Sequence, residues 1–234
     1  MAWCGTPPSV SDWFLAWNGS VIQGALLILM LACVSLTKRP RPFLLGWLAL
    51  VVAFVSPLCA LTAALFGARV LHHLLLVLVA APLLALAFPA RRASGPAAPA
   101  IAFVLVMWGW HWPPAYLSAY DSVTVYWAMQ LSLFASGMWF WRAATAPTAD
   151  AIPTLASIGA VSGAMGLLGG LLTFAAQPLY LPHILTTEAF GLTALEDQQL
   201  GGLLMWVPGM VPFAIAGILL ARRRLAGLEA DATR

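Results

Sequence analysis

Long apolar stretches, broken only by short polar segments, constrain this chain more than any other feature. Each is close to the length that a helix needs to cross the hydrocarbon core of a bilayer, about 20 residues. Seven can be read, at residues 19–36, 43–62, 69–88, 99–112, 122–141, 153–175 and 199–220. Proline, glycine and charged residues mark the breaks between them. We therefore predict an all-α polytopic membrane protein with seven transmembrane helices in a single domain over residues 1–234.

The low charge content excludes a soluble globular fold. Only 8% of the residues are charged and 62% are hydrophobic, whereas soluble domains carry roughly 25% charged residues. The net charge of +3 comes from basic residues scattered among short loops, so nucleic-acid binding is not expected. The sequence motifs of nucleotide-binding enzymes, serine hydrolases and zinc proteases are absent. We therefore expect a protein that is not an enzyme.

Basic residues predict the orientation of the helices, because Lys and Arg concentrate in cytoplasmic loops. With the N-terminus outside, ten of the eleven basic residues fall on the cytoplasmic side, and Arg69 alone falls outside. The ten are Lys38, Arg39, Arg41, Arg91, Arg92, Arg142, Arg222, Arg223, Arg224 and Arg234. Most acidic residues take the other side, namely Asp12, Asp121, Glu188, Glu196 and Asp197. We predict a bacterial inner-membrane protein with a periplasmic N-terminus and a cytoplasmic C-terminus.

The three cysteines give no metal or disulfide signature. They stand at positions 4, 33 and 59, and no two are spaced as CxxC. We therefore expect neither a disulfide scaffold nor a zinc knuckle, and we assign no role to Cys4 or Cys33.

The sixth apolar stretch carries a stripe of glycines. Gly159 and Gly163 form one GxxxG pair, and Gly166 and Gly170 form another. Small residues at this spacing let helix backbones approach closely in lipid. We therefore expect this helix to pack centrally in the bundle.

All four histidines fall in the periplasmic layer of the predicted bundle. His72 and His73 open the third stretch, His111 ends the fourth, and His183 lies in the long loop before the seventh. Other polar or soft side chains join this layer, namely Cys59, Arg69, Met107, Gln130, Asp197, Gln198, Gln199 and Met205. Polar groups within a membrane are costly and face the bundle interior or a partner. Taken singly, each histidine is better explained as an interface anchor or a hydrogen-bonded packing residue. Their shared layer makes a functional site as good an explanation as a structural one.

The chemistry of these side chains is that of a copper site. Imidazole, thioether and thiolate groups suit copper, especially cuprous copper. Met107 and His111 are four residues apart and share one helix face. His72 and His73 are adjacent, about 100° apart around a helix, so we expect that they do not both face one metal.

Several segments resemble the CtaG family of membrane assembly factors for caa-type cytochrome c oxidases. The matching blocks are RVLHHLLL from Arg69, AAPLL from Ala80, WHWP from Trp110, LLTF from Leu171, PLY from Pro178, LEDQQL from Leu195 and MWVPG from Met205. They occur in order across roughly residues 45–220. The resemblance implies a seven-helix, periplasm-facing protein that helps to mature heme-copper oxidases at the copper-loading step.

The resemblance also implies a set of site residues. The positions that match the family's motif residues are His73, His111, Asp197, Gln198, Met205 and Trp206. Two positions depart from the pattern, because Arg69 and Gln130 stand where many members carry histidine. If those histidines bind metal in the relatives, the site of this chain has fewer ligands.

Our first hypothesis is a membrane chaperone that binds copper transiently for a heme-copper oxidase subunit. His73 and His111 would be the primary ligands, and the further candidates are Met107, Met205, His183 and His72. Asp197, Gln198 and Arg69 would support the ligands, Asp197 by orienting an imidazole.

Two other functions compete with the copper hypothesis. In the first, His73 and His111 are axial ligands of a b-type heme, or the protein is a quinone-binding redox protein. In the second, the protein is a metal-free scaffold or accessory subunit of an oxidase.

Overall fold

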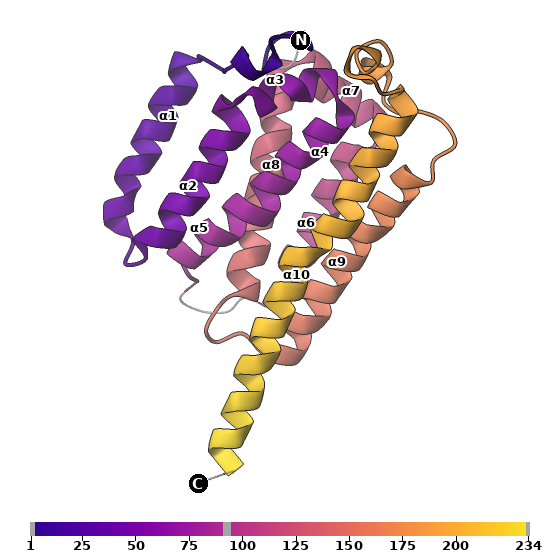
Figure 1. Cartoon of the computed structure of the whole chain (residues 1–234). Coiled ribbons are helices and arrows are strands. Elements are labelled where there is room, and N and C mark those ends of the chain that lie inside the picture. The colour runs from indigo at the N-terminus through magenta and orange to yellow at the C-terminus, as the bar shows by residue number, and fades with distance from the viewer. Residues whose placement is uncertain (1–2, 91–94, 233–234) are drawn as a thin grey trace.

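The computed structural model describes residues 3–90 and 95–232, and it shows a bundle of helices (Figure 1). The protein is 79% helical, and the described residues include no strand. The main helices are α1 (Val21–Ala32), α2 (Pro40–Val55), α3 (Pro57–Ala64), α4 (Phe66–Leu74), α5 (Ala81–Ala87), α6 (Ala97–His111), α7 (Pro113–Asp121), α8 (Val123–Ala144), α9 (Ala151–Thr173) and α10 (Ala194–Ala232). Short turns η1 (Trp13–Leu15), η2 (Cys33–Leu36), η4 (Leu181–His183) and η5 (Glu188–Phe190) and the π-helical turn η3 (Leu75–Ala80) complete the order. The all-α prediction is confirmed.

Three helices of the described residues are long and apolar enough to cross a membrane, namely Phe66–Ala87, Ala151–Thr173 and Ala194–Gly227. A fourth crossing results if α2 and α3, which meet at 48°, form one broken span. Two further apolar helices, Val21–Leu36 and Ala97–His111, are shorter, and α8 has 22 residues but includes Thr, Ser, Gln and Arg. A helix therefore lies at each of the seven predicted stretches, whereas three or four have the length and composition of a span.

Proline and an extended residue separate α2 from α3. Pro57 is the first residue of α3, and Ser56 before it is extended, at φ −70° and ψ 168°, because a residue that precedes proline avoids the helical region. The Ser56 hydroxyl accepts a hydrogen bond from the Leu58 amide at 3.2 Å, which satisfies one of the unpaired donors at the start of α3. The bend between the two helices is therefore set by local sequence.

The π-helical turn η3 is supported by an indole from α8. In a π-helix each amide donates to the carbonyl five residues earlier, as Ala81 N does to Leu76 O. The next donor would be Pro82, which has no N–H, so Val77 O lacks a partner within the helix. Trp141 Nε1 donates to Val77 O at 2.8 Å and takes the place of the missing amide.

Glycines let α9 and α10 pack closely. A Cβ on Gly169 would lie 2.7 Å from Gly202 O, and one on Gly202 would lie 2.6 Å from Gly169 O. No atom lies within 4 Å of a Cβ placed on Gly159, Gly163 or Gly170. Close packing is therefore confirmed at Gly169, but not at Gly159, Gly163 or Gly170. The expected central position is not borne out, because α9 packs mainly on α10 and α6.

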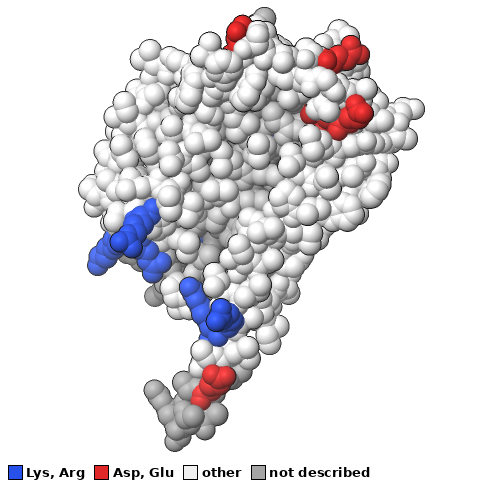
Figure 2. All heavy atoms as spheres, viewed as in Figure 1, with Lys and Arg blue, Asp and Glu red and all other residues white. Residues whose placement is uncertain are grey.

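Charges of opposite sign gather at opposite ends of the described bundle (Figure 2). Basic side chains lie at the lower end, near the start of α2 and on α10, and acidic side chains lie mainly at the upper end. We call these the basic end and the acidic end. Asp150, at the start of α9, and Glu229, far along α10, are exceptions among the acidic residues, and the buried Arg69 of α4 is an exception among the basic ones. Arg91, Arg92 and Arg234, which entered the predicted topology, lie outside the described residues.

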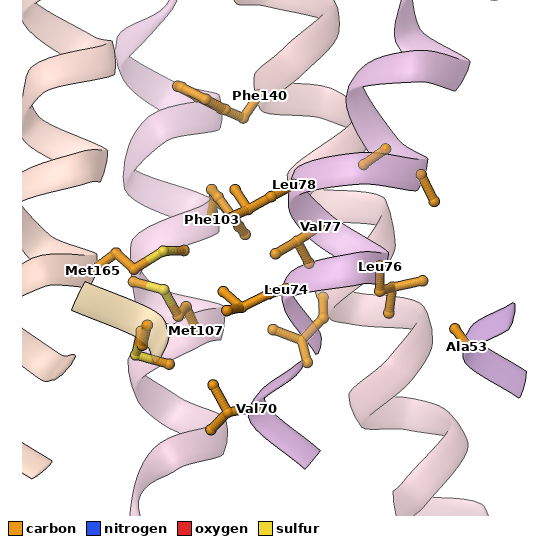
Figure 3. Packing of buried hydrophobic residues seen from close by; sticks show 14 of the residues in the cluster. Ala53, Val70, Leu74, Leu76, Val77, Leu78, Phe103, Met107, Phe140 and Met165 are labelled. Atoms are coloured by element: carbon orange, nitrogen blue, oxygen red, sulfur yellow. The ribbon is translucent and has the colours of Figure 1, made fainter. Parts of the chain in front are cut away.

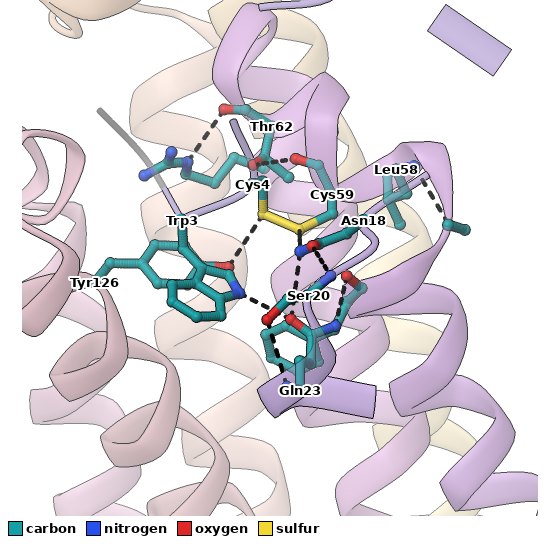
Figure 4. Close-up of a disulfide and its surroundings, with 12 residues drawn as sticks. Trp3, Cys4, Asn18, Ser20, Gln23, Leu58, Cys59, Thr62 and Tyr126 are labelled. Atoms are coloured by element: carbon teal, nitrogen blue, oxygen red, sulfur yellow. Dashed lines mark hydrogen bonds between the residues drawn. A yellow bond between two sulfur atoms is a disulfide. The ribbon is translucent and has the colours of Figure 1, made fainter. Parts of the chain in front are cut away.

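A disulfide joins Cys4 to Cys59, which are 55 residues apart in the chain (Figure 4). The expectation that Cys4 has no role is therefore wrong. Trp3 lies against Trp127 with ring centres 5.3 Å apart, and its Nε1 donates to Gln23 Oε1 at 2.8 Å. These contacts bring the N-terminal segment against α3 and α8, so a distant cysteine reaches Cys59 at the acidic end. The absence of CxxC spacing could not exclude this pairing, because tertiary contacts bring the two cysteines together.

Candidate functional site

Helix α4 supplies the buried polar side chains at the centre of the bundle. Arg69, His72 and His73 lie on it and are 1%, 0% and 5% exposed. Leu65, which precedes α4, has no side-chain oxygen to cap the helix. The Asp197 carboxylate from α10 does so, because Phe66 N donates to Oδ2 at 2.5 Å and Gly67 N donates to Oδ1 at 3.0 Å. Asp197 thus holds the helix that carries the histidines and makes both of these bonds to backbone amides.

His73 and His111 form a pair across α4 and α6. Their ring centres are 6.1 Å apart and the rings are nearly perpendicular, at 81°. His111 Nδ1 lies 2.7 Å from Met107 O. Because a carbonyl only accepts, Nδ1 carries the proton and Nε2 keeps its lone pair. In this tautomer, Nε2 of His111 is able to coordinate a metal.

His72 faces a different neighbour. Its ring centre lies 4.9 Å from that of Phe54 on α2, in an edge-on contact, and 5.8 Å from that of His73. The two adjacent histidines diverge around α4, and His73 is the one in ring contact with His111. The sequence alone could not show which of these two adjacent histidines lies beside His111.

The nitrogens of His72 and His73 have no hydrogen-bond partner among the described residues. Buried polar atoms in native proteins are almost always paired with protein, water or a bound ion. An unpartnered imidazole nitrogen of this kind is free to accept a water molecule or a bound group. For His73, which lies beside His111, that group has two imidazoles within reach.

Thioethers lie buried on three helices around this part of the core. Met107 on α6, Met165 on α9 and Met205 on α10 are 2%, 1% and 2% exposed. Figure 3 shows Met107 and Met165 pointing into the same part of the core as Leu74 of α4. No three or more His, Cys, Asp or Glu side chains within residues 3–90 and 95–232 are grouped to hold a metal. A metal at the pair would therefore need thioethers or an external group as further ligands.

Arg69 is a buried cation held between aromatic rings. Its guanidinium carbon lies 5.0 Å from the ring centre of Tyr116 and 5.4 Å from that of Tyr120, and its Nε donates to Thr62 O at 3.3 Å. Cation–π contact of this kind stabilises a desolvated guanidinium. Nη1 and Nη2 have no hydrogen-bond partner in the described part of the chain. Arg69 is not equivalent to a histidine ligand, because it has no lone pair to offer a metal.

His183 is not available as a ligand, which corrects its inclusion among the candidates. Its Nδ1 lies 3.2 Å from Ala64 O and its Nε2 lies 2.5 Å from the Tyr116 hydroxyl. Nδ1 therefore donates to the carbonyl, and Nε2 accepts from Tyr116. Burial raises the pKa of Tyr116 above its usual range, so the phenol keeps its proton. Both ring nitrogens of His183 are used to join η4 to α3 and α7.

His183 gives the fold a measurable pH dependence. Burial, with the Arg69 charge as a second cause, lowers the pKa of His183 from 6.5 to about 3. The unfolded chain then binds a proton that the folded chain does not, so stability is lost as pH falls from 6.5 toward 3. We expect the stability advantage of wild type over His183→Asn to shrink by roughly 1–2 kcal/mol between pH 6.5 and 5. Detergent unfolding curves at the two pH values measure this, and an advantage that is constant with pH would contradict it.

The block from Glu196 to Gln199 ties the loop between α9 and α10 to the start of α10. Glu196 Oε2 accepts from Thr193 N at 2.8 Å, and Thr193 Oγ1 accepts from Glu196 N at 3.2 Å, which is a capping box. Gln198 Oε1 accepts from Leu179 N at 2.6 Å, and Gln199 Nε2 donates to Ala175 O at 3.3 Å. The contacts of Gln198 are thus to backbone atoms of the loop. This polar block organises the acidic end of the bundle.

Tyrosines belong to the site and were not among the predicted site residues. Tyr180 donates its hydroxyl proton to His111 O at 2.9 Å, and its ring stacks on Phe66 at 4.1 Å. Tyr116 bonds to His183, and Tyr120 donates to Ala63 O at 3.1 Å. The chain has four tyrosines, and in the predicted topology all lie toward the layer that holds the histidines. Their shared layer could have indicated the tyrosines as site residues, as it did for the histidines.

Comparison with known proteins identifies a family. The family model described as "Cytochrome c oxidase caa3 assembly factor" matches residues 32–226, which is most of the chain. No curated protein matches, and neither does any solved structure. The matched range includes α4, α6 and most of α10, and with them the His73–His111 pair and Asp197.

Proposed function

Because the chain belongs to the family of cytochrome c oxidase caa3 assembly factors, we propose that it binds copper for a heme-copper oxidase during assembly. Copper is in this account the cargo, held briefly and passed to an oxidase subunit. The observation that carries the proposal is the buried pair His73 and His111, with ring centres 6.1 Å apart. Two imidazoles that share a metal through bonds of about 2.0 Å have ring centres roughly 6 Å apart.

The donor set suits cuprous copper. One nitrogen of His111 keeps its lone pair because Nδ1 is bonded to Met107 O, and both nitrogens of His73 lack partners among the described residues. Buried thioethers of Met107 and Met205 lie on α6 and α10. Imidazole and thioether groups are ligands that Cu(I) accepts in low coordination number. A site with two imidazoles and few other donors would hold the ion weakly enough to release it.

The residues around the pair position it. Asp197 holds the start of α4, on which His73 lies, and Tyr180 bonds to the backbone of His111. Arg69 adds a positive charge on α4, one turn from His73. A nearby cation lowers the affinity for a metal ion, which favours transfer over storage.

We also propose that all seven predicted stretches cross the bacterial inner membrane, with the acidic end in the periplasm. The separation of charges in Figure 2 agrees with the rule that basic residues stay on the cytoplasmic side. The Cys4–Cys59 disulfide lies at the acidic end, and disulfides persist in oxidising compartments such as the periplasm. A fluorescent protein fused to the C-terminus should therefore fluoresce, because it folds in the cytoplasm. Alkaline phosphatase fused to the same terminus should be inactive there.

We expect His73→Asn and His111→Ala each to remove most of the bound Cu(I) from protein loaded anaerobically in detergent. Elemental mass spectrometry should give about one copper per wild-type chain and well below half of that for either variant, because a lost imidazole leaves too few donors.

The matched control is His72→Asn. His72 is buried, is adjacent to His73 and faces Phe54, so its loss perturbs the same helix without removing a ligand of the pair. Copper content in His72→Asn should remain near that of wild type. Equal copper in all four proteins would refute the site, and a Soret band in the optical spectrum would favour heme in its place. Restoration of oxidase activity in a deletion strain by added copper supports delivery, and failure of rescue would support a scaffold.

A further inference from the structure

A cavity lies at the basic end of the bundle. It has a volume of about 420 Å³ and lies between η3 with α5, the end of α8, and α10. The lining includes Leu78, Pro82, Leu86, Trp141, Leu219 and Arg223. The cavity exists because α5 packs on α2 and α8, whereas α10 packs on α4 and α9. The helices α5 and α10 therefore part toward the basic end (Figure 1).

The interior of this cavity, which we call the groove, is apolar because its polar groups already have hydrogen-bond partners within the protein. Trp141 Nε1 donates to Val77 O, so the indole offers the groove an apolar ring. Thr145 Oγ1 donates to Trp141 O at 2.7 Å. The charged residue in the lining is Arg223. Such a groove suits a hydrocarbon chain along its length and an anion at one end.

Cations flank the basic end of the groove on both sides. Arg223 belongs to α10, and Arg39 reaches the other wall, where its Nη1 donates to Leu86 O at 3.4 Å. Leu86 itself lines the groove. Figure 2 shows basic side chains in two groups at this end, one near the start of α2 and one on α10. Asp150 lines an adjoining cavity together with Arg223 and Arg224, so the net charge on that side remains positive.

We propose that this groove binds an anionic phospholipid, with an acyl chain between α5 and α10 and the phosphate between Arg39 and Arg223. Arginine recognises phosphate through paired N–H donors, and basic pockets between helices on the cytoplasmic side bind anionic headgroups. The inference uses the membrane location proposed above and does not depend on copper.

The test compares dioleoylphosphatidylglycerol with dioleoylphosphatidylcholine on purified protein, with bound lipid counted by native mass spectrometry. Two cations near a lipid surface are worth roughly fivefold each in affinity. We therefore expect the variant R39Q/R223Q to bind phosphatidylglycerol about 25-fold more weakly than wild type. Ala216→Trp, which fills the groove and keeps both arginines, should also lose the lipid, because Ala216 lines the cavity.

The matched control is Arg142→Gln. Arg142 lies at the same end but lines a different cavity, so phosphatidylglycerol binding should stay within about twofold of wild type. An equal loss in Arg142→Gln would show general surface attraction and overturn the site. Equal retention of phosphatidylcholine, or unchanged binding in Ala216→Trp, would also overturn it. Copper content of R39Q/R223Q should equal that of wild type, so failure of the copper proposal and failure of this one are separable.

Discussion

Asp197→Ala lowers the free energy of unfolding by about 3 kcal/mol or more, since two hydrogen bonds to a buried charged acceptor are lost. The carboxylate accepts from the first two amides of α4, at 2.5 and 3.0 Å, and no side chain of α4 replaces it as a cap. Its negative charge also lies at the positive end of the helix dipole. Unfolding of the detergent-solubilised protein by sodium dodecyl sulfate measures the loss.

Two variants separate this effect from a general loss of acidic residues. Asp197→Asn keeps one acceptor oxygen and should be intermediate in stability. Glu196→Ala removes the neighbouring carboxylate, which caps α10 at the surface, and should cost much less. Asp197→Ala should also reduce bound copper, because His73 lies on the helix that Asp197 holds. Wild-type stability in Asp197→Ala would contradict the capping role.

Cys4→Ser/Cys59→Ser destabilises the protein by about 4 kcal/mol, the value expected when a cross-link across some 55 residues is removed from the unfolded chain. The link joins the N-terminal segment to α3, and Tyr126 and Asn18 hydrogen-bond to the two sulfurs at 3.4 and 3.7 Å. Treatment of wild type with a phosphine reductant should lower its stability to that of the double variant.

Cys33 supplies the control, because it is the free cysteine of the described chain. Cys33→Ser should unfold like wild type with and without reductant. Thiol titration of the denatured, non-reduced protein should give one thiol per chain of the three cysteines present. Three thiols per chain would show that the disulfide does not form.

The helical stretches could be predicted because each is a local property of the sequence. Apolar runs and their proline breaks predict a helical stretch at each of the seven positions where α1 to α6 and α8 to α10 occur, whereas α7 (Pro113–Asp121) was not predicted. The broken pair α2 and α3 is marked by Ser56-Pro57. The π-turn could not be predicted, because its free carbonyl at Val77 is satisfied by Trp141, 64 residues away. The Cys4–Cys59 link depends in the same way on tertiary contacts.

The sequence could predict that the candidate site residues lie at one level of the bundle, but it could not predict which side chains contact one another. Sequence position put His73 and His111 at one level of the bundle, and the structure brings them to 6.1 Å. Position in the sequence could not show that both ring nitrogens of His183 form hydrogen bonds, to Ala64 and Tyr116. Nor could it show that Asp197 binds backbone amides. Hydrogen-bond partners in these cases come from other helices, and a single sequence does not specify them.

X-ray absorption at the copper edge of the Cu(I)-loaded protein decides whether His73 and His111 bind the metal, because it counts the imidazoles bound to copper. We expect two imidazole nitrogens at about 2.0 Å in wild type and in His72→Asn, and one after His111→Ala. A copper environment without imidazole, or one that does not change when His111 or His73 is replaced, would contradict it.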